Sequence, residues 1–246
     1  LAAWDPITLG QDVRWVMVSQ IDVAEAFVPV DPEGKEFFKK YTELYGYYDL
    51  FLIEPDGFVF YTVAREPDYH TNMLTGPYAD SNLGRMIKSV LGSGRVGFAD
   101  YAPYAPSKGE PAAFIAQPLI HDGTIQSIVA LQLSTEAINK IMQQRAGMGE
   151  SGETYLVGTD KRMRSDSFLD KENRSLKASF AGTIDKNGVD TEAVREVFSG
   201  RKDIRIIRDY RDVPVLSAFA PVQVFDQTWA VLAEIDGVIK IQKKPG

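Results

Sequence analysis

Residues 47–63 read YYDLFLIEPDGFVFYTV, and this stretch decides the fold class of the chain. Two apolar runs, 48–53 and 58–63, are rich in the aromatic and aliphatic residues that favour β-strands. Between them, Glu54-Pro55-Asp56-Gly57 places proline and glycine where a β-turn requires them. The stretch therefore predicts an antiparallel β-hairpin.

Helices are predicted before and after this hairpin from apolar residues at helical spacing. The four predicted helices begin near Asp31, Ser81, Ser134 and Asp190, and they end at Gly46, Gly92, Gly147 and Gly200. Further strands are predicted at 96–101, 112–120 and 124–133, with a turn at 121–123. The expected class is α+β, with antiparallel sheets flanked by helices and a helical segment near the N-terminus.

The second half of the chain repeats the first at a nearly constant distance. Residues 154–158 parallel 50–54, residues 214–221 (PVLSAFAP) parallel 111–118 (PAAFIAQP), and residues 230–235 parallel 128–133. The offsets between these pairs are 104, 103 and 102 residues. A constant period indicates two copies of one structural unit. We therefore predict tandem modules at 47–146 and 147–240, preceded by a strand and helix segment at 1–46.

A third echo of the repeat lies at the N-terminus. Trp15–Asp22 reads WVMVSQID and mirrors Trp229–Asp236, which reads WAVLAEID. Residues 1–30 therefore resemble the closing strand and exit helix of a module. Two interpretations stay open: the tail of a preceding module, or a strand that docks on one of the two predicted modules.

Composition narrows the functional classes. The 246-residue chain has a net charge of −7 and no cysteine. Since nucleic-acid binding depends on basic surfaces, we expect no nucleic-acid partner. The lack of cysteine excludes disulfides and thiol nucleophiles. No apolar run reaches the roughly 20 residues that span a bilayer, and no signal peptide opens the chain, so it reads as the soluble part of a longer protein.

A family resemblance rests on five strings in a fixed order: residues 47–63, 71–83 (TNMLTGPYADSNL), 101–119, 149–167 and 210–222. Together they resemble the double Cache (dCache) domains, tandem PAS-like sensor modules of bacterial chemoreceptors and sensor histidine kinases. The resemblance covers residues 35–236. It implies a periplasmic or extracellular sensor domain of an inner-membrane receptor, with a ligand-binding membrane-distal module and a membrane-proximal module. It also implies a homodimer in the full-length receptor, and membrane contact only through flanking segments.

The predicted ligand site lies in the distal module, because aromatic walls with a few polar groups are typical of small-molecule pockets. Its predicted residues are Tyr69, His70, Tyr78, Arg85, Asp100, Tyr101, Tyr104, Phe114 and Gln132. Arg85, Tyr104 and Gln132 align with pocket positions of the family's amino-acid-sensing branch.

The chain departs from that branch at the acids. Pro106 and Gln132 stand where the branch has acidic residues, and Arg85 lacks the aromatic pair that follows it there. A carboxylate is the natural partner of a buried ammonium group. We therefore expect an organic acid or a neutral metabolite as the ligand, with Arg85 as an anion clamp.

Catalytic motifs are missing or misplaced in the sequence. Gly147–Gly152 matches the string GxGxxG, but it follows a predicted helix and opens a strand, the reverse of the context that binds dinucleotides. His70 and His121 are the two histidines, and no HExxH, EF-hand loop or GxSxG elbow accompanies them. We predict no catalytic residue, no metal and no cofactor.

Two alternatives to a sensor remain. One is a periplasmic hydrolase with an atypical catalytic group near His70 or His121, and the other is a structural interaction module that binds no ligand. A further expectation concerns the charged stretch Lys161–Ser167, which predicts a solvated turn; the alternative is that Arg164 or Asp166 lines a second, smaller cavity in the proximal module.

Overall fold

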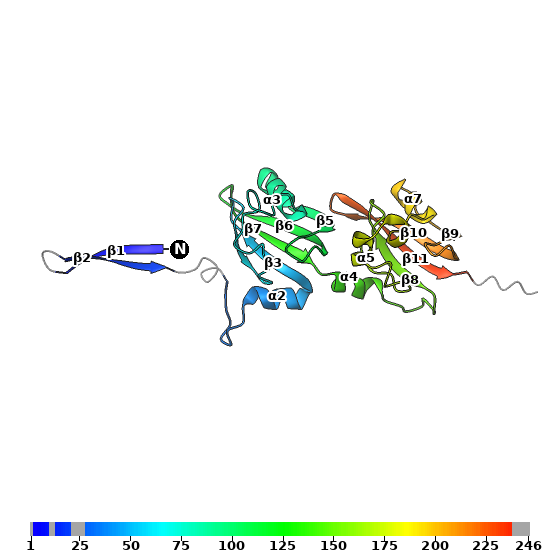
Figure 1. Cartoon of the computed structure of the whole chain (residues 1–246), viewed down its shortest axis with the longest axis horizontal. Helices are drawn as coiled ribbons and strands as arrows, with labels where there is room; N and C mark the ends of the chain where they lie inside the picture. Colours follow the sequence, from blue (N-terminus) through cyan, green and yellow to red (C-terminus); the bar gives the residue numbers. More distant parts are fainter. Residues whose placement is uncertain (1, 10–12, 21–27, 238–246) are drawn as a thin grey trace, which may run out of the picture.

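The computed structural model describes residues 2–9, 13–20 and 28–237. It contains two α/β modules arranged along the long axis of the molecule, with a β-hairpin beyond the first of them (Figure 1). The first module comprises β3–β7 with helices α2 and α3, the second comprises β8–β11 with helices α5–α7, and helix α4 joins them. The predicted class, two tandem modules with antiparallel sheets flanked by helices, is confirmed.

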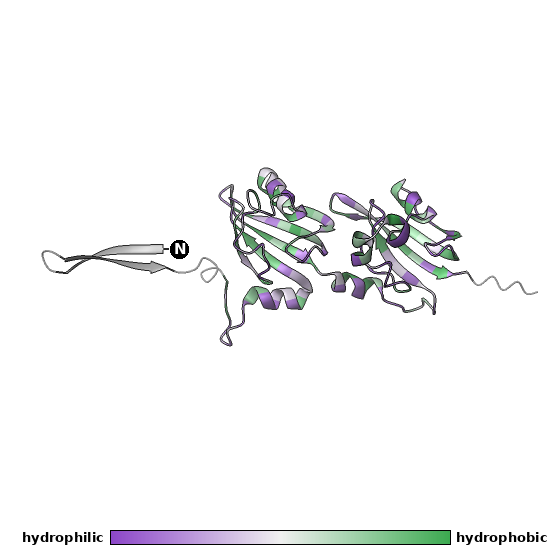
Figure 2. Ribbon diagram, viewed as in Figure 1, coloured by the Kyte–Doolittle hydropathy of each residue, from purple (hydrophilic) through white to green (hydrophobic). Residues whose placement is uncertain are grey.

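The first module is built on a five-stranded antiparallel sheet in the order β4-β3-β7-β6-β5. Its strands are β3 (Tyr47–Ile53), β4 (Val59–Thr62), β5 (Gly97–Pro103), β6 (Pro111–His121) and β7 (Thr124–Leu133). The opening hairpin predicted from residues 47–63 is β3 and β4. Apolar residues follow these strands in Figure 2, because every interior strand is covered on at least one face.

The second module repeats this topology in a four-stranded sheet in the order β8-β11-β10-β9. Its strands are β8 (Glu153–Val157), β9 (Asp203–Arg208), β10 (Pro214–Val224) and β11 (Gln227–Asp236). They correspond in order to β3, β5, β6 and β7. The counterpart of β4 is a single bridge between Val157 and Met163. The sequence repeat is thus a repeat of strand topology.

The predicted helices exist with shifted ends. Helix α2 covers Phe37–Tyr45, α3 Asn82–Ser93, α4 Thr135–Met142, α5 Leu176–Ala181, α6 Ile184–Asn187 and α7 Glu192–Phe198. Ser81 and Ser134 cap α3 and α4 as predicted, each accepting a hydrogen bond from a backbone N–H three residues later. Helix α3 ends at Gly94, past the predicted Gly92. In the part of the chain that the structure describes, no helix is long and apolar enough to cross a membrane.

The start of α2 corrects a prediction. Asp31 does not cap a helix; its side chain accepts hydrogen bonds from the N–H groups of Glu33 and Lys35 in a turn. The helix begins six residues later, after Glu36, and ends at Gly46 with φ at 73°. Residues 31–34 read DPEG and form a turn closed by the Gly34 N–H on the Asp31 carbonyl.

Each sheet has its main core on one face. In the first module α3 packs there, and Phe51, Ile87 and Phe114 are fully buried. Helix α2 covers the opposite face, where Phe38 lies against Tyr61. In the second module α7 packs over the corresponding main core. The tandem therefore contains two separate cores rather than one.

A fourth apolar cluster joins the two modules. Phe98 of β5 stacks on Phe225 at the β10–β11 turn, with ring centroids 5.4 Å apart, and Trp229 completes the contact. Beside this cluster, Arg164 of the second module forms a two-pronged ion pair with Asp100 of the first. Arg164 is only 3% exposed and Ser165 is fully buried, so the prediction of a solvated turn at Lys161–Ser167 is wrong. Arg164 is buried in the contact between the modules, whereas Met163 is buried in the core of the second module and Ser165 beside β8, where its hydroxyl accepts a hydrogen bond from the Leu156 N–H.

The N-terminal hairpin pairs β1 (Ala2–Leu9) with β2 (Val13–Gln20) in a sheet of its own. The strand predicted at Trp15–Asp22 is β2, and it joins neither module's sheet. The exit helix predicted after it falls partly on 21–27, outside the described residues, and residues 28–36 form no helix.

Candidate ligand-binding site

Polar side chains gather inside the first module where β3 begins and β7 ends. Asp49 of β3, Gln132 of β7 and Phe114 of β6 lie side by side across the sheet, because Gln132 is in register with both neighbours. Asp49 is fully buried and Gln132 is 5% exposed. Cross-strand partners share one face of a sheet, so a charged group and an amide meet the aromatic core here.

Asp68 reaches this cluster from the loop after β4. Its side chain is fully buried, and the Tyr104 hydroxyl donates to Oδ2 at 2.7 Å. Oδ1 accepts no hydrogen bond from the described residues. Burial raises the pKa of Asp68, and the negative charge of Glu66 raises it further. The same burial, together with Asp68, raises the pKa of Tyr104.

A chain of hydrogen bonds links Glu66 to Gln132. The Ser107 hydroxyl donates to Glu66 Oε2 at 2.6 Å, and Gln132 Nε2 donates to Ser107 Oγ at 3.3 Å. The Tyr48 hydroxyl donates to the other oxygen of Glu66 at 2.9 Å. The Gln132 Oε1 atom accepts nothing from the described residues. A buried acceptor without a donor costs about 1–3 kcal/mol, so this site favours a molecule that donates hydrogen bonds.

Asp49 adds a third carboxylate close to this network. Its Oδ1 accepts hydrogen bonds from the N–H groups of Leu50, Val63 and Ala64, at 2.7, 2.8 and 3.0 Å. Burial raises the pKa of Asp49 to about 7, and the charge of Asp68 acts in the same direction. The three backbone N–H donors stabilise the ionised form of Asp49 and so offset part of the cost of burying its charge.

A cavity of about 220 Å³ opens onto this network. Its walls come from β3, β7, the loops at 66 and 107–111, and the start of α4; the lining residues are Tyr48, Glu66, Ser107, Lys108, Glu110, Pro111, Gln132, Leu133, Thr135 and Glu136. Three of these are carboxylates and one is a lysine. The cavity can therefore hold a cationic group against its acids, with Lys108 available for an anionic group on the same molecule.

Three of the predicted site residues belong to this site. Tyr104, Phe114 and Gln132 lie together, and the rings of Tyr104 and Phe114 meet edge to face with centroids 4.9 Å apart. Tyr69, next to Asp68 in sequence, is half-buried and its ring lies against that of His70. His70 is exposed with φ at 61° and also stacks on Phe58.

The other four predicted residues lie elsewhere. Tyr78 packs against the apolar core under α3. Arg85 is exposed on α3 and donates to the carbonyl oxygen of Asp80, outside the cavity. Asp100 and Tyr101 belong to the contact between the modules, through Arg164 and the apolar cluster. The structure thus separates Arg85 from the buried polar groups.

Sequence reasoning missed Asp49, Glu66, Asp68 and Ser107. One signal could have identified Asp49: it interrupts an apolar strand, YYDLFLI, which is costly unless the acid has a role. Glu66 and Asp68 lie in a loop whose folding brings them under the sheet, and no local pattern predicts that burial.

Comparisons with known proteins bear on the fold. No family model matches the chain. A probable chemoreceptor, y4sI, of Sinorhizobium fredii is 22% identical over 210 residues, which are 79% of this chain and 27% of that protein. The chain thus spans about a quarter of that relative's length.

Two solved structures are similar. The ligand-binding domain of Pseudomonas fluorescens chemoreceptor CtaA, in complex with L-serine, is 15% identical over 81% of this chain and 77% of its own, with a TM-score of 0.52. That of the Pseudomonas aeruginosa amino acid chemoreceptor PctC, in complex with GABA, is 15% identical over 77% and 74%, with a TM-score of 0.50. The chain has the double Cache fold.

Within this double Cache fold, the second module carries a related polar network that is complete. Glu153 occupies the place of Asp49, and it accepts from the hydroxyls of Ser167 and Tyr210 at 2.7 and 2.6 Å. Glu234 occupies the place of Gln132 and accepts from the hydroxyls of Tyr155 and Ser217 at 2.7 and 2.8 Å. Every carboxylate oxygen of this pair has a donor. In the first module, by contrast, buried acceptors have no donor among the described residues, and a ligand can supply one.

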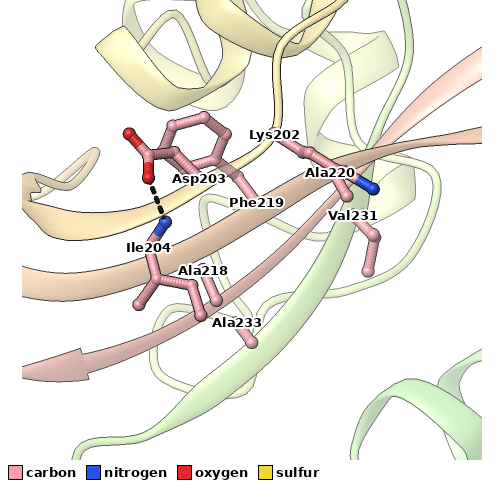
Figure 3. Close-up of a pocket in the computed structure, with 8 residues that line it drawn as sticks. All are labelled: Lys202, Asp203, Ile204, Ala218, Phe219, Ala220, Val231 and Ala233. Carbon is pink, nitrogen blue, oxygen red and sulfur yellow. Dashed lines mark hydrogen bonds between the residues drawn. The ribbon is translucent and has the colours of Figure 1, made fainter.

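A larger cavity, of about 610 Å³, lies on the sheet of the second module (Figure 3). Its lining is mostly apolar, with Ile204 and Phe219 beside three alanines, and Lys202 and Asp203 are its charged residues. Small-molecule pockets usually orient their ligands with a few converging polar groups. Apart from Lys202 and Asp203, the lining of this cavity offers no polar side chain.

Proposed function

We propose that this chain is the extracytoplasmic ligand-sensing part of a transmembrane receptor, and that the acidic cavity of its first module binds a small metabolite with a protonated amine. One observation carries this proposal. Two buried acceptors, Asp68 Oδ1 and Gln132 Oε1, have no donor among the described residues. Gln132 lines a cavity that also presents Glu66, Glu110 and Glu136, and Asp68 lies close enough to Glu66 and Asp49 for their charges to interact, without lining the cavity itself.

An ammonium group matches this environment chemically. It offers three hydrogen-bond donors and a positive charge, which unpaired acceptors and carboxylates both favour. Ligand charge also offsets the repulsion between Glu66 and Asp68 that raises the pKa of Asp68. The predicted role of Arg85 as the binding group for an acidic ligand has no support, because Arg85 is exposed and its guanidinium donates to the carbonyl oxygen of Asp80. A carboxylate as a second group of the ligand is compatible with Lys108.

The related structures support the same chemical class. L-serine in the CtaA complex and GABA in the PctC complex both carry an amine and a carboxylate. We propose a ligand of this kind here, held through side chains of this chain's own, Glu66, Asp68 and Gln132. We propose no catalytic role for His70, whose ring stacks on Phe58, or for His121, which lies 3.4 Å from Asp122 in an exposed turn.

Signalling in this proposal is a shift between two states of the domain. A ligand that binds one state more tightly increases its population. The cavity wall includes Thr135 and Glu136 of α4, the helix between the modules. One turn later, Asn139 exchanges two hydrogen bonds of 2.8 Å with Asp166 of the second module. We propose that ligand binding acts on the second module through α4, in a receptor that dimerises and carries a separate output domain.

The test is a thermal-shift screen of the purified chain, followed by calorimetry. The panel pairs amino acids and small amines with their N-acetyl derivatives and with organic acids. A ligand at roughly a hundred times its dissociation constant stabilises by about 2.7 kcal/mol, which raises Tm by a few degrees. We expect hits among the amines and none among their acetylated partners.

Two variants make the test specific. Asp68→Asn should abolish the shift, while Arg85→Ala should leave it unchanged, and circular dichroism confirms that both fold. The proposal fails if only organic acids stabilise the protein, or if the shift survives Asp68→Asn and disappears in Arg85→Ala.

A further inference from the structure

The second module contains a polar cavity of about 520 Å³ that the proposed ligand site does not include. Helices α6 and α7, the loop before α5 and the turn between β9 and β10 form its walls. Three arginines and five carboxylates are among its twelve lining residues, and we call it the arginine cavity. Its volume exceeds the 220 Å³ of the acidic cavity, so it accommodates a larger molecule.

Arg174 is the buried cation of this cavity. It is 9% exposed, whereas the other two lining arginines, Arg195 and Arg208, are exposed. Its Nη1 atom donates to the Lys186 carbonyl oxygen at 2.5 Å, and Asp170 Oδ2 lies 3.7 Å from Nη1, too far for a hydrogen bond. Its Nε atom is buried without an acceptor among the described residues, and Nη2 has no hydrogen bond to them either. The edge of the guanidinium that carries Nε and Nη2 therefore lacks an acceptor, and a ligand can supply one.

Contacts on both sides of Arg174 fix the position of its guanidinium. The backbone N–H of Arg174 donates to the Asp170 carbonyl oxygen at 2.8 Å, and its carbonyl oxygen accepts from the Ser167 N–H at 2.9 Å. The guanidinium carbon lies 4.8 Å from the centre of the Tyr210 ring, and the Tyr210 hydroxyl donates to Glu153 at 2.6 Å. A ring stacked on the face of a guanidinium leaves its edge donors free. Arg174 is therefore preorganised to bind a planar acceptor along that edge, and a carboxylate is such an acceptor.

The acids of the arginine cavity favour a ligand with a single negative charge. Asp185 is exposed and forms no ion pair with the residues that the structure describes. The other four carboxylates each lie 2.7 to 3.3 Å from an arginine; the pairs are Asp190 with Arg195, Glu192 with Arg205, Asp209 with Arg211, and Asp212 with Arg208. Five carboxylates around one unpaired guanidinium edge repel a doubly charged phosphate ester more strongly than a carboxylate.

The rest of the ligand follows from the same acids. Carboxylate oxygens accept hydrogen bonds and donate none, and hydroxyl groups supply donors to them without adding charge. We propose that the arginine cavity is a second ligand site of this chain, and that it binds a monocarboxylate rich in hydroxyl groups, such as a sugar acid. The carboxylate binds the Nε and Nη2 edge of Arg174. The inference is independent of the ligand proposal, because none of its residues lines the acidic cavity.

Isothermal titration calorimetry of the whole chain with D-glucuronate and D-gluconate tests this site. We expect saturable, equimolar binding of at least one of the two sugar acids. D-glucose keeps the hydroxyl groups but has no carboxylate, and glucose 6-phosphate carries a doubly charged group instead. Both should bind at least about tenfold more weakly than the sugar acid, which is the loss expected for one charge-assisted hydrogen bond.

Two substitutions of the same type locate the carboxylate. Arg174→Lys keeps the positive charge but loses the two parallel donors, so it should weaken sugar-acid binding at least about tenfold. Arg201→Lys is the matched control, because the Arg201 side chain is 64% exposed, pairs with Glu196 and does not line the cavity. It should bind as wild type does. Asp68→Asn, which should abolish amine binding in the first module, should also leave sugar-acid binding unchanged, so the two ligand proposals can fail separately.

Hydrogen exchange of the wild-type chain gives a readout that depends on no variant. The bound sugar acid should protect backbone amides in 184–192 and 208–212, which belong to the walls of the arginine cavity. The proposal is overturned if neither sugar acid binds, if Arg174→Lys binds as tightly as wild type, or if protection falls on 107–111 of the acidic cavity instead. Tighter binding of glucose 6-phosphate than of either sugar acid would overturn the choice of a carboxylate.

Discussion

Asp49 makes the stability of the first module depend on pH. Its folded-state pKa is about 7, against an ordinary value of 3.8. Between these two values the unfolded chain has already lost the proton that the folded chain still holds. Stability contributed at this position therefore falls as pH rises from 3.8 to about 7 and is constant above that range.

Asp49→Asn should remove this fall. The amide oxygen can still accept from the backbone N–H groups at 50, 63 and 64, while the ionisable proton is gone. The variant should gain stability relative to wild type as pH rises through that range, by on the order of a few kcal/mol. Urea unfolding at successive pH values measures the difference. Asp122→Asn, at a 91% exposed side chain, should follow the wild-type curve; parallel curves for Asp49→Asn would refute the assignment.

At this scale the sequence predicts the site only in part. Tyr104 and Gln132 were predicted by aligning the order of elements, Phe114 was predicted as an aromatic wall, and the three lie together. Asp68 could not be found in this way, since its burial depends on how a loop folds beneath the sheet. Arg85 was misleading because the family alignment was followed against the helical periodicity: Leu83, Met86, Ile87 and Val90 form the buried face of α3, and Arg85 lies on the opposite, exposed side.

Among the elements, α3 contains two glycines in opposite environments. A Cβ at Gly84 would lie 2.4 Å from the Ala79 carbonyl oxygen and 2.6 Å from that of Tyr78, whereas a Cβ at Gly92 would meet nothing within 4 Å. Alanine normally stabilises a helix over glycine by about 1 kcal/mol. Close packing at Gly84 reverses that preference.

Gly84→Ala should therefore destabilise the protein by about 1–3 kcal/mol, the usual effect of overpacking. Gly92→Ala, in the same helix, should stabilise it by about 0.5–1 kcal/mol. Chemical denaturation of the two variants beside wild type gives both values. If both substitutions stabilised the protein, helix propensity, and not the close approach of residues 78 and 79 to Gly84, would determine the effect.

The start of α2 shows why an element boundary was mispredicted. Asp31-Pro32 is typical of a helix N-terminus, and it is equally typical of a turn. Gly34, with φ at 80°, decides for the turn. The same pattern of proline followed by glycine closes the β3–β4 hairpin at residues 54–57, where it was interpreted correctly. β3, β6 and β7 were easier to predict because the repeat supplied each of them a second time, as β8, β10 and β11, whereas β9 lies outside the repeated strings and was not predicted.

In the whole molecule, the Asp100–Arg164 pair joins residues 64 positions apart. No sequence pattern indicates such a contact, and this is why Arg164 was expected in solvent. Removing one partner of a buried ion pair leaves the other charge uncompensated, at a cost of about 3–5 kcal/mol. Asp160, 3.0 Å from Arg164, offsets part of that cost.

Asp100→Ala should therefore lower the free energy of unfolding by about 3 kcal/mol and separate the unfolding of the two modules. The double variant Asp100→Leu with Arg164→Met should recover most of the loss, because no charge is left buried. Scanning calorimetry reports both the stability and the number of transitions. If the double variant were no more stable than Asp100→Ala, the ion pair would contribute more to stability than the mutual compensation of two buried charges.

Helix α4 has the properties of a short lever. Its first residues form a wall of the acidic cavity, and Asn139 is fixed to Asp166 of the second module one turn later. Three residues of helix are only about 4.5 Å long. A displacement of α4 at the cavity end therefore reaches the second module within one turn of helix. A helical segment this short bends too little to absorb the displacement.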